Sequence, residues 1–281
     1  MKTILLTITA ILATLAVMGC DQEADYVVVD RYVYEEDSPP PVPQGVYSVT
    51  RDNAVLLYWL PIDDVIGDFA TYIVYRSDHD PDTGYHEIGR TTAEEFVDHS
   101  VINGHKYYYA VSSMDDDGNL SDLSYEYVFD TPRPQGTNQA LFDVYVSPEF
   151  AGWDFANARA VHYLSVDCDL FLEYYAGDSV YYFDVANSAT WIQDMGYTVD
   201  LDEIDYAPEY GWSKNGWCEV ILGHTYVIWT DDNHFAKVRV TGINGEKVIF
   251  DWAYQVATGN PELKPLVNPN PDYLRHPQAG M

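Results

Sequence analysis

Between residues 44 and 132 the chain alternates apolar and polar positions in short runs. Val55, Leu57 and Trp59 share one parity, and Tyr107 and Tyr109 open another run of the same kind. Because successive side chains of a β-strand point to opposite faces, this alternation predicts strands with one buried face. Turn-forming residues separate the runs, among them Asp80-Pro81, Asn103-Gly104 and Asp117-Gly118-Asn119. Short alternating strands with such turns predict an antiparallel sandwich.

Residues 140–256 predict a second all-β region. Phe250, Trp252 and Tyr254 would form one face of a closing strand, and the Asn244-Gly245 pair before it favours a tight hairpin turn. A further hairpin turn is predicted at residues 231–234, and residues 161–175 and 180–185 are strand-like. Residues 190–195 alone predict a short helical turn. The fold class expected for the chain is therefore all-β, with two antiparallel domains.

The flanking segments have different compositions. Residues 21–43 are acidic and end in a proline-rich run, which predicts an extended tether, with residues 26–34 able to add as an edge strand. Residues 131–139 hold two prolines and a glycine and predict an interdomain linker. Residues 257–281 hold several prolines and predict a disordered tail.

Residues 1–20 have the anatomy of an export signal. Lys2 gives a positive start, residues 4–17 are mostly apolar, and the run is short for a membrane span. Its end, Val17-Met18-Gly19-Cys20, resembles a bacterial lipobox, which implies that Cys20 is lipidated and becomes the mature N-terminus. An ordinary secretory signal or a short membrane anchor is the alternative. The lipobox predicts an exported protein on a bacterial membrane, at the cell surface or facing the periplasm.

Residues 44–132 resemble a fibronectin type III domain. Trp59 falls at the family's buried core tryptophan, and residues 72–77 match its third-strand pattern. Tyr107, with Val101 six residues earlier, falls at the corner tyrosine, whose hydroxyl satisfies a backbone group upstream. The resemblance implies a spacer or binding module without catalysis.

Residues 140–256 resemble the HmuY-like domain of bacterial surface lipoproteins. Trp153-Asp154-Phe155 matches its opening motif, Asp167-Cys168-Asp169-Leu170 the strand that follows, and Lys237 the usual lysine of the final hairpin. The resemblance implies a β-rich fold and capture of haem through axial histidine or methionine. The family's ligand-bearing segments do not align here, so no ligand can be carried over.

The side chains available for haem are His162, Met195, His224 and His234. His162 shares the parity of Leu164 and Val166, which favours a core histidine instead of a ligand. Two such ligands would have to face one cavity. The sequence gives no sign of that convergence.

The formal net charge of the chain is −31, from 45 acidic and 14 basic residues. This charge argues against nucleic acid as a partner, since binding requires cations that displace phosphate counterions. It equally disfavours electrostatic attachment to anionic lipid. A solvated surface is one explanation of the charge, and binding of cations or of a basic partner is the other.

Two further groups of residues suggest chemistry. Cys168 and Cys218 remain once Cys20 carries lipid, so the sequence allows a disulfide between them or two separately buried thiols. Asp78, Asp80 and Asp82 resemble a calcium loop, although its glycine is one position late and Gly89 replaces the bidentate glutamate. No hydrolase elbow, zinc motif, phosphate loop or redox pair of cysteines is present in the sequence.

Aromatic residues gather between residues 189 and 218. They either anchor a ligand or fill the core of a segment poor in strands. The candidates are Trp191, Tyr206, Tyr210, Trp212 and Trp217. The expected function is non-catalytic binding or display by a lipid-anchored protein, without a required cofactor and with a surface protein, carbohydrate or haem as ligand. Haem capture for iron uptake is the first alternative, and a carbohydrate-active enzyme or carbohydrate-binding accessory protein is the second.

Overall fold

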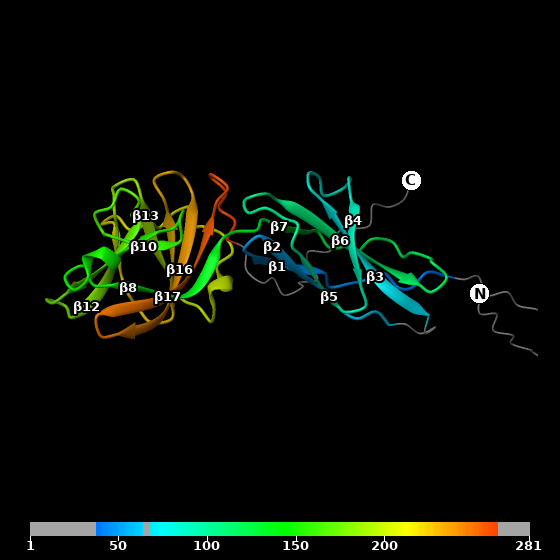
Figure 1. Cartoon of the computed structure of the whole chain (residues 1–281), viewed down its shortest axis with the longest axis horizontal. Helices are drawn as coiled ribbons and strands as arrows, with labels where there is room; N and C mark the ends of the chain where they lie inside the picture. Colours follow the sequence, from blue (N-terminus) through cyan, green and yellow to red (C-terminus); the bar gives the residue numbers. More distant parts are fainter. Residues whose placement is uncertain (1–37, 64–67, 264–281) are drawn as a thin grey trace, which may run out of the picture.

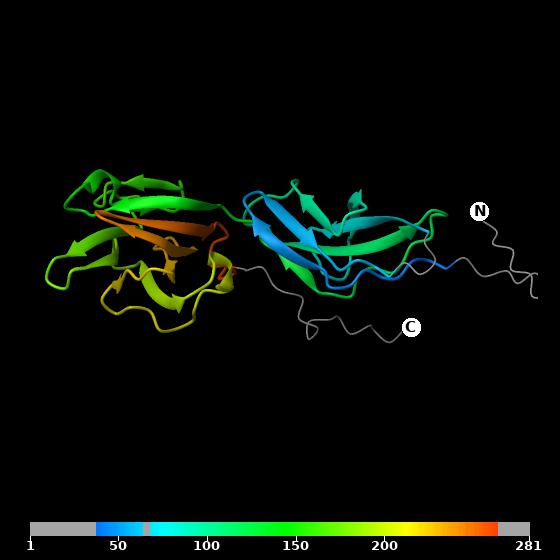
Figure 2. The ribbon, with the colours of Figure 1, turned by 90° about the horizontal axis from the view of Figure 1, so that it is seen from below.

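The computed structural model describes residues 38–63 and 68–263, which form two β domains placed end to end (Figures 1 and 2). The fold is all-β, as predicted, and its strands pair antiparallel throughout the described sheets. The described residues contain no helix long and apolar enough to cross a bilayer. Residues 1–37, with the export signal, Cys20 and most of the tether, lie outside the described part.

The N-terminal domain is a sandwich of a three-stranded and a four-stranded sheet, with strand orders β1-β2-β5 and β4-β3-β6-β7. Its strands are β1 (Tyr47–Arg51), β2 (Ala54–Tyr58), β3 (Phe69–Ser77), β4 (His86–Thr91), β5 (Glu95–Asp98), β6 (Tyr107–Asp115) and β7 (Val128–Asp130). This arrangement agrees with the fibronectin type III resemblance of the sequence.

The core of this domain is formed by the residues that the alternating pattern predicts to face inward. Trp59 and Tyr72 are buried and meet edge-on, with ring centroids 5.3 Å apart. The predicted tyrosine corner is present, because the backbone N–H of Ile102 donates to the hydroxyl of Tyr107 at 3.0 Å. The backbone donor of Ile102 is thereby satisfied a few residues before β6.

The C-terminal domain has two five-stranded sheets, ordered β10-β9-β11-β12-β14 and β13-β15-β16-β17-β8. In the first sheet the strands are β9 (Gly152–Asp154), β10 (Arg159–Val161), β11 (Leu170–Tyr175), β12 (Val180–Val185) and β14 (Trp217–Glu219). In the second they are β8 (Gln135–Phe142), β13 (Trp191–Tyr197), β15 (His224–Trp229), β16 (Phe235–Asn244) and β17 (Lys247–Gln255). Two short 3₁₀ helices, η1 (Pro148–Phe150) and η2 (Leu201–Glu203), lie in the connections.

The inner faces of these two sheets enclose one core. Trp153 of β9 meets Phe250 of β17 edge-on, with ring centroids 5.2 Å apart. Tyr226 repeats the corner of the first domain, since its hydroxyl accepts from the N–H of Ile221 at 2.8 Å and donates to the carbonyl of Glu219 at 2.7 Å. The hairpins predicted at residues 231–234 and 243–246 join β15 to β16 and β16 to β17. The HmuY-like resemblance stays a prediction.

Three sequence expectations differ from the structure. Residues 191–195 lie in strand β13 instead of a helical turn, and residues 191–194 pair with β15. Of residues 161–175, only Val161 at the end of β10 and residues 170–175 of β11 are in strands, and the loop between them leaves Leu164 72% and Val166 97% exposed. The expected linker already enters β8 at Gln135, which pairs with Ala253 of β17.

The ends of the described chain are more ordered than predicted. Pro40 and Pro43 of the expected tether are buried, and the carbonyl of Pro41 accepts from the hydroxyl of Ser113 at 2.6 Å. At the other end Leu263, expected in a disordered tail, is fully buried. Residues 264–281 lie outside the described part.

The same C-terminal segment joins the two domains. The carboxylate of Glu262 accepts from the hydroxyl of Thr131 at 2.9 Å and pairs with the ammonium of Lys106. Arg133, fully buried between the domains, lies 3.6 Å from the carboxylate of Asp202. These contacts tie the fibronectin-like domain to the domain that carries the candidate sites.

Candidate functional site

Aromatic rings cover one end of the outer face of the sheet β13-β15-β16-β17-β8. Ile192 and Ile228 belong to the core, so Trp191 and Trp229 beside them point outward, and these two residues pair directly across the strands. We call the group of Trp191, Trp212, Trp229 and Phe235 the aromatic shelf. Trp212 lies 6.0 Å from Trp229, and Phe235 stacks on Trp229 at 5.5 Å, measured between ring centroids.

A loop at residues 205–213 brings Trp212 to this face. The N–H of Ser213 donates to the carbonyl of Ile192 at 2.8 Å, and the N–H of Ala207 donates to that of Pro261 at 2.9 Å. Gly211 has a φ of +99°, and a Cβ there would lie 3.0 Å from the amide of Gln193. A side chain at position 211 would therefore strain the backbone and crowd Gln193.

Trp191 is the exposed ring of the shelf, whereas Phe235 is buried and Trp212 and Trp229 are half-buried against the cluster of Val227 and Leu263. Trp191 is 42% exposed, and Tyr210, next to Gly211 in the loop, is 82% exposed. The indole N–H of Trp229 donates to Asn233 at 2.9 Å, and the amide of Asn187 donates to Asp231 at 3.2 Å. Ring faces beside amide and carboxylate oxygens can hold a molecule that offers both C–H surfaces and hydroxyl groups.

The structure divides the aromatic candidates of the sequence. Trp229 pairs with Trp191 across the strands and its ring lies 6.0 Å from that of Trp212; the sequence does not single it out, although its outward parity on β15 could have indicated it. Tyr206, 46% exposed, forms an isolated bridge with Glu262 instead. Trp217 lies on β14 of the other sheet, where its ring meets that of Tyr182 at 4.8 Å.

The two cysteines are free thiols in the structure, so the disulfide expected as one alternative is not formed. Cys168 precedes β11 and Cys218 lies on β14, with β12 between these strands. Burial raises the pKa of the Cys168 thiol to about 12 and that of the Cys218 thiol to about 11. Both are therefore protonated, poorly reactive thiols at neutral pH.

The four haem candidates do not converge in the described residues. His224 opens β15, where its Nδ1 lies 3.0 Å from both carboxylate oxygens of Asp194, and His234 follows the far end of that strand. His162 lies on the other side of the domain, where its Nδ1 accepts from the N–H of Leu164 at 3.0 Å. Its half-exposed position corrects the expectation of a core histidine. Met195 packs in the cluster of Val227 and Leu263.

The proposed calcium loop uses its carboxylates internally. Asp78 forms an ion pair with Arg76 at 2.8 Å, and one oxygen of Asp80 accepts from the N–H groups of Asp82 and Thr83. Among the described residues no three histidine, cysteine or acidic side chains form a group that could hold a metal ion. The loop thus has the hydrogen bonding of an ordinary turn.

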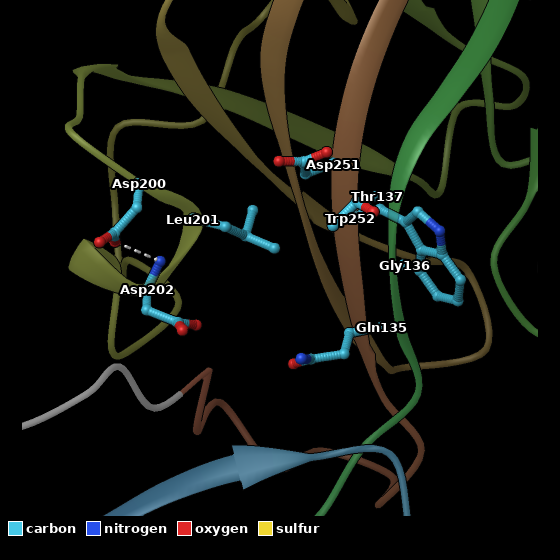
Figure 3. A pocket seen from close by; sticks show the side chains of 8 residues that line it. All are labelled: Gln135, Gly136, Thr137, Asp200, Leu201, Asp202, Asp251 and Trp252. Carbon is cyan, nitrogen blue, oxygen red and sulfur yellow. Dashed lines mark hydrogen bonds between the residues drawn. The ribbon is translucent and has the colours of Figure 1, made fainter.

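A pocket of about 430 Å³ lies beside the domain junction, between η2 and the paired strands β8 and β17 (Figure 3). Its lining residues are Gln135, Gly136, Thr137, Asp200, Leu201, Asp202, Asp251 and Trp252. Each carboxylate already has an internal partner. Asp200 accepts from the N–H of Asp202, Asp251 accepts from the N–H of Asn138, and Asp202 lies 3.5 Å from the ammonium of Lys237. These bonds indicate a structural role at the junction.

No family model matches the chain. Two curated relatives, amylopullulanases of Thermoanaerobacterium saccharolyticum and Thermoanaerobacterium thermosulfurigenes, are each 33% identical over 97 residues. The match covers 34% of this chain but only 7% and 5% of theirs, so the chain spans a small part of their length.

Fibronectin type III domains are among the similar solved structures. An Fn3-like protein from Clostridium thermocellum is 27% identical, with 34% of this chain and 98% of that chain covered and a TM-score of 0.29. A β-1,2-glucanase from Parabacteroides distasonis is 22% identical, with 38% and 14% covered and a TM-score of 0.30.

Proposed function

We propose that this protein is an exported, lipid-anchored binding protein without catalytic activity, whose aromatic shelf binds a neutral polysaccharide. The observation that carries the proposal is the cross-strand pair Trp191 and Trp229 on an outer sheet face, with Trp212 beside it. Trp191 lies at the exposed edge of this face, on the edge strand β13, where a long chain can pack against it without threading into a cleft.

The chemistry of the shelf favours sugars over other ligands. The C–H faces of a pyranose ring pack against indole rings, and its hydroxyl groups donate to carboxylate oxygens such as those of Asp231. The net charge of −31 repels polyanionic chains, so a neutral glycan is the expected ligand class. The partial match to amylopullulanases makes pullulan and amylopectin the first polymers to test.

The order of the domains supports display away from a membrane. The first described residues, near Ser38, enter the fibronectin-like domain at the end away from the second domain (Figure 1). A lipid on Cys20 would therefore place the fibronectin-like domain as a spacer between the bilayer and the aromatic shelf. The proposal requires neither haem nor calcium.

Affinity electrophoresis of the protein from Asp21 onward, in gels with and without polysaccharide, tests the proposal. The polymers are pullulan, amylopectin, a β-glucan and the anionic polymer pectin. We expect at least one neutral polymer to retard the wild-type protein, and Trp191→Ala to weaken binding about tenfold or more, because the most exposed ring of the shelf is lost.

Tyr127→Ala is the matched control, since Tyr127 is 45% exposed but lies on the fibronectin-like domain. It should bind as the wild type does. Equal retardation of the Trp191→Ala variant and the wild type, or no retardation in any of the gels, would exclude the aromatic shelf as a glycan site.

A further inference from the structure

The outer face of the other sheet, β10-β9-β11-β12-β14, carries a different surface. Its side chains alternate with the core residues Leu170, Leu172 and Phe183, so they point away from the core. We call it the acid–aromatic face, formed by Phe171, Glu173, Tyr182, Asp184, Trp217 and Glu219. Three carboxylates thus share one surface with three rings.

The strand register places the members in two rows. Asp184 on β12 pairs with Phe171 on β11 and with Trp217 on β14, so its carboxyl group lies between two rings. In the next row Tyr182 pairs with Glu173 on one side and with Glu219 on the other. Side chains directly across neighbouring strands are about 5 Å apart at Cβ, which is contact distance.

The ring of Trp217 is the accessible part of this face. It is 41% exposed and meets Tyr182 edge-on at 4.8 Å, measured between ring centroids. The hydroxyl of Tyr182 donates to Asp178 at 3.2 Å, which fixes the orientation of the neighbouring ring. Trp217 therefore presents an accessible indole ring next to Asp184, held in place by its contact with Tyr182.

Within the described part of the chain, the carboxylates of this face have no cationic partner. The chain contains no lysine or arginine between Arg159 and Lys214. None of the ion pairs found among residues 38–63 and 68–263 involves Glu173, Asp184 or Glu219. Burial, and after it the charge of Glu173, raises the pKa of Asp184 to about 6. A partly buried carboxylate in this setting gains from a cation supplied by another molecule.

We propose that the acid–aromatic face binds the guanidinium group of an arginine on a basic protein partner. A guanidinium can stack on the ring of Trp217 while it donates two hydrogen bonds to the carboxylate of Asp184. Tryptophan, tyrosine and arginine are also the residues most enriched at the energetic centres of protein interfaces. The net charge of −31 accelerates encounters with a basic partner.

This face is separate from the aromatic shelf. The two surfaces are the outer faces of different sheets, which enclose one core between them, so they point in opposite directions. An arginine-bearing partner and a glycan would therefore not compete, and failure of one proposal leaves the other standing.

Calorimetric titration of the intact protein with Nα-acetyl-L-argininamide tests the proposal at pH 7. We expect binding that the uncharged Nα-acetyl-L-citrullinamide does not reproduce, because citrulline has a similar shape without the charge. Asp184→Asn and Trp217→Ala should each weaken binding about fivefold or more. Asp116→Asn, which removes one exposed charge from the fibronectin-like domain, is the control and should leave binding unchanged.

The pH dependence gives a second readout that does not depend on Trp217→Ala folding. The other titratable groups that face Asp184 are Glu173, Tyr182 and Glu219. Binding should weaken as the pH falls from 7 to 5, since Asp184 takes up a proton near pH 6, and Asp184→Asn should flatten this dependence. Equal binding of the citrulline analogue, unchanged affinity in Asp184→Asn, or no binding of the arginine compound would each overturn the proposal.

Discussion

Replacing Lys237 by alanine is expected to lower the free energy of unfolding of the second domain by about 3–5 kcal/mol. Lys237 is fully buried under η2 and the C-terminal segment, where its ammonium donates to the carbonyls of Ile204 at 2.9 Å and Leu263 at 2.8 Å. Burial lowers the pKa of Lys237 well below its ordinary value, and Arg133 adds to this effect. Alanine would leave a cavity, two carbonyls without donors and Asp202 without one of its cations.

Denaturant unfolding followed by tryptophan fluorescence measures this loss, since six of the seven tryptophans lie in the second domain. Lys214→Ala, an exposed lysine before β14, is the control and should change the free energy by less than about 0.5 kcal/mol. Lys237→Met should recover part of the loss because it refills the volume. A Lys237→Ala variant within about 1 kcal/mol of the wild type would show that the C-terminal segment does not depend on this ammonium.

Replacing Asp169 by asparagine is expected to stabilise the protein above pH 7 by about 2–4 kcal/mol. Burial, with Asp154, Asp232 and Asp231 nearby, raises the pKa of Asp169 to about 7. An unfolded chain releases this proton near pH 4, so the native state loses stability as the pH rises from 4 through 7. Asparagine has no such proton to lose, and its carbonyl oxygen can still accept from the N–H of Phe155, a bond of 2.9 Å in the structure.

Melting temperatures of the wild type and of Asp169→Asn, measured between pH 3.5 and 8, test this direction of the pH dependence. The melting temperature of Asp169→Asn minus that of the wild type should be near zero at pH 3.5. This difference should increase between pH 4 and 7 and stay constant above pH 7. Asp167→Asn is the matched control, because Asp167 is an exposed neighbour paired with Arg159 at 3.1 Å and should shift stability little at any pH. A difference that is independent of pH would mean that asparagine acts through packing and not through ionisation.

The strands of the first domain could be predicted because local and tertiary signals agree there. Trp59, Tyr107 and Tyr109 occupy the buried parity that alternation assigned, and the turns carry the expected glycines and asparagines. The loop before β11 has the sequence pattern of a strand, because Leu164 and Val166 alternate with polar residues. Local acceptors prevail, since the ring of His162 and the hydroxyl of Ser165 accept from backbone N–H groups two residues later.

Long-range contacts explain the remaining differences. Leu263 lies in a proline-rich segment whose composition predicts a tail, yet its side chain is buried with Val227 and its carbonyl accepts from Lys237. Lys237 itself occupies an outward position on β16, where a lysine is normally exposed. The sequence does not show that Leu263 and Lys237 are partners, because η2 and the end of the described chain, which are distant in sequence, cover the outer face of β16.

In the candidate sites, too, local sequence patterns predict some features, while others depend on long-range strand pairing. The sequence left open whether the aromatic residues between 189 and 218 are exposed or fill a core; the structure exposes Trp191, while Trp212 packs against the cluster of Val227 and Leu263. The sequence could not separate Trp217 from Trp191, since only the pairing of β14 with β12 and of β13 with β15 assigns them to different sheets. The pairing of β13 with β15 also places Trp229 beside Trp191.

A single two-dimensional NMR spectrum of the seven indole N–H groups tests the polysaccharide assignment most directly. The probe is a short oligosaccharide of the neutral polymer that retards the protein most, and tryptophan-to-phenylalanine variants assign the signals. The signals of Trp191, Trp212 and Trp229 should move on titration, while those of the core residues Trp59 and Trp153 and of Trp217 on the other face should stay in place. Binding with no movement at Trp191, or with movement confined to Trp217, would contradict the assignment of the glycan to the aromatic shelf.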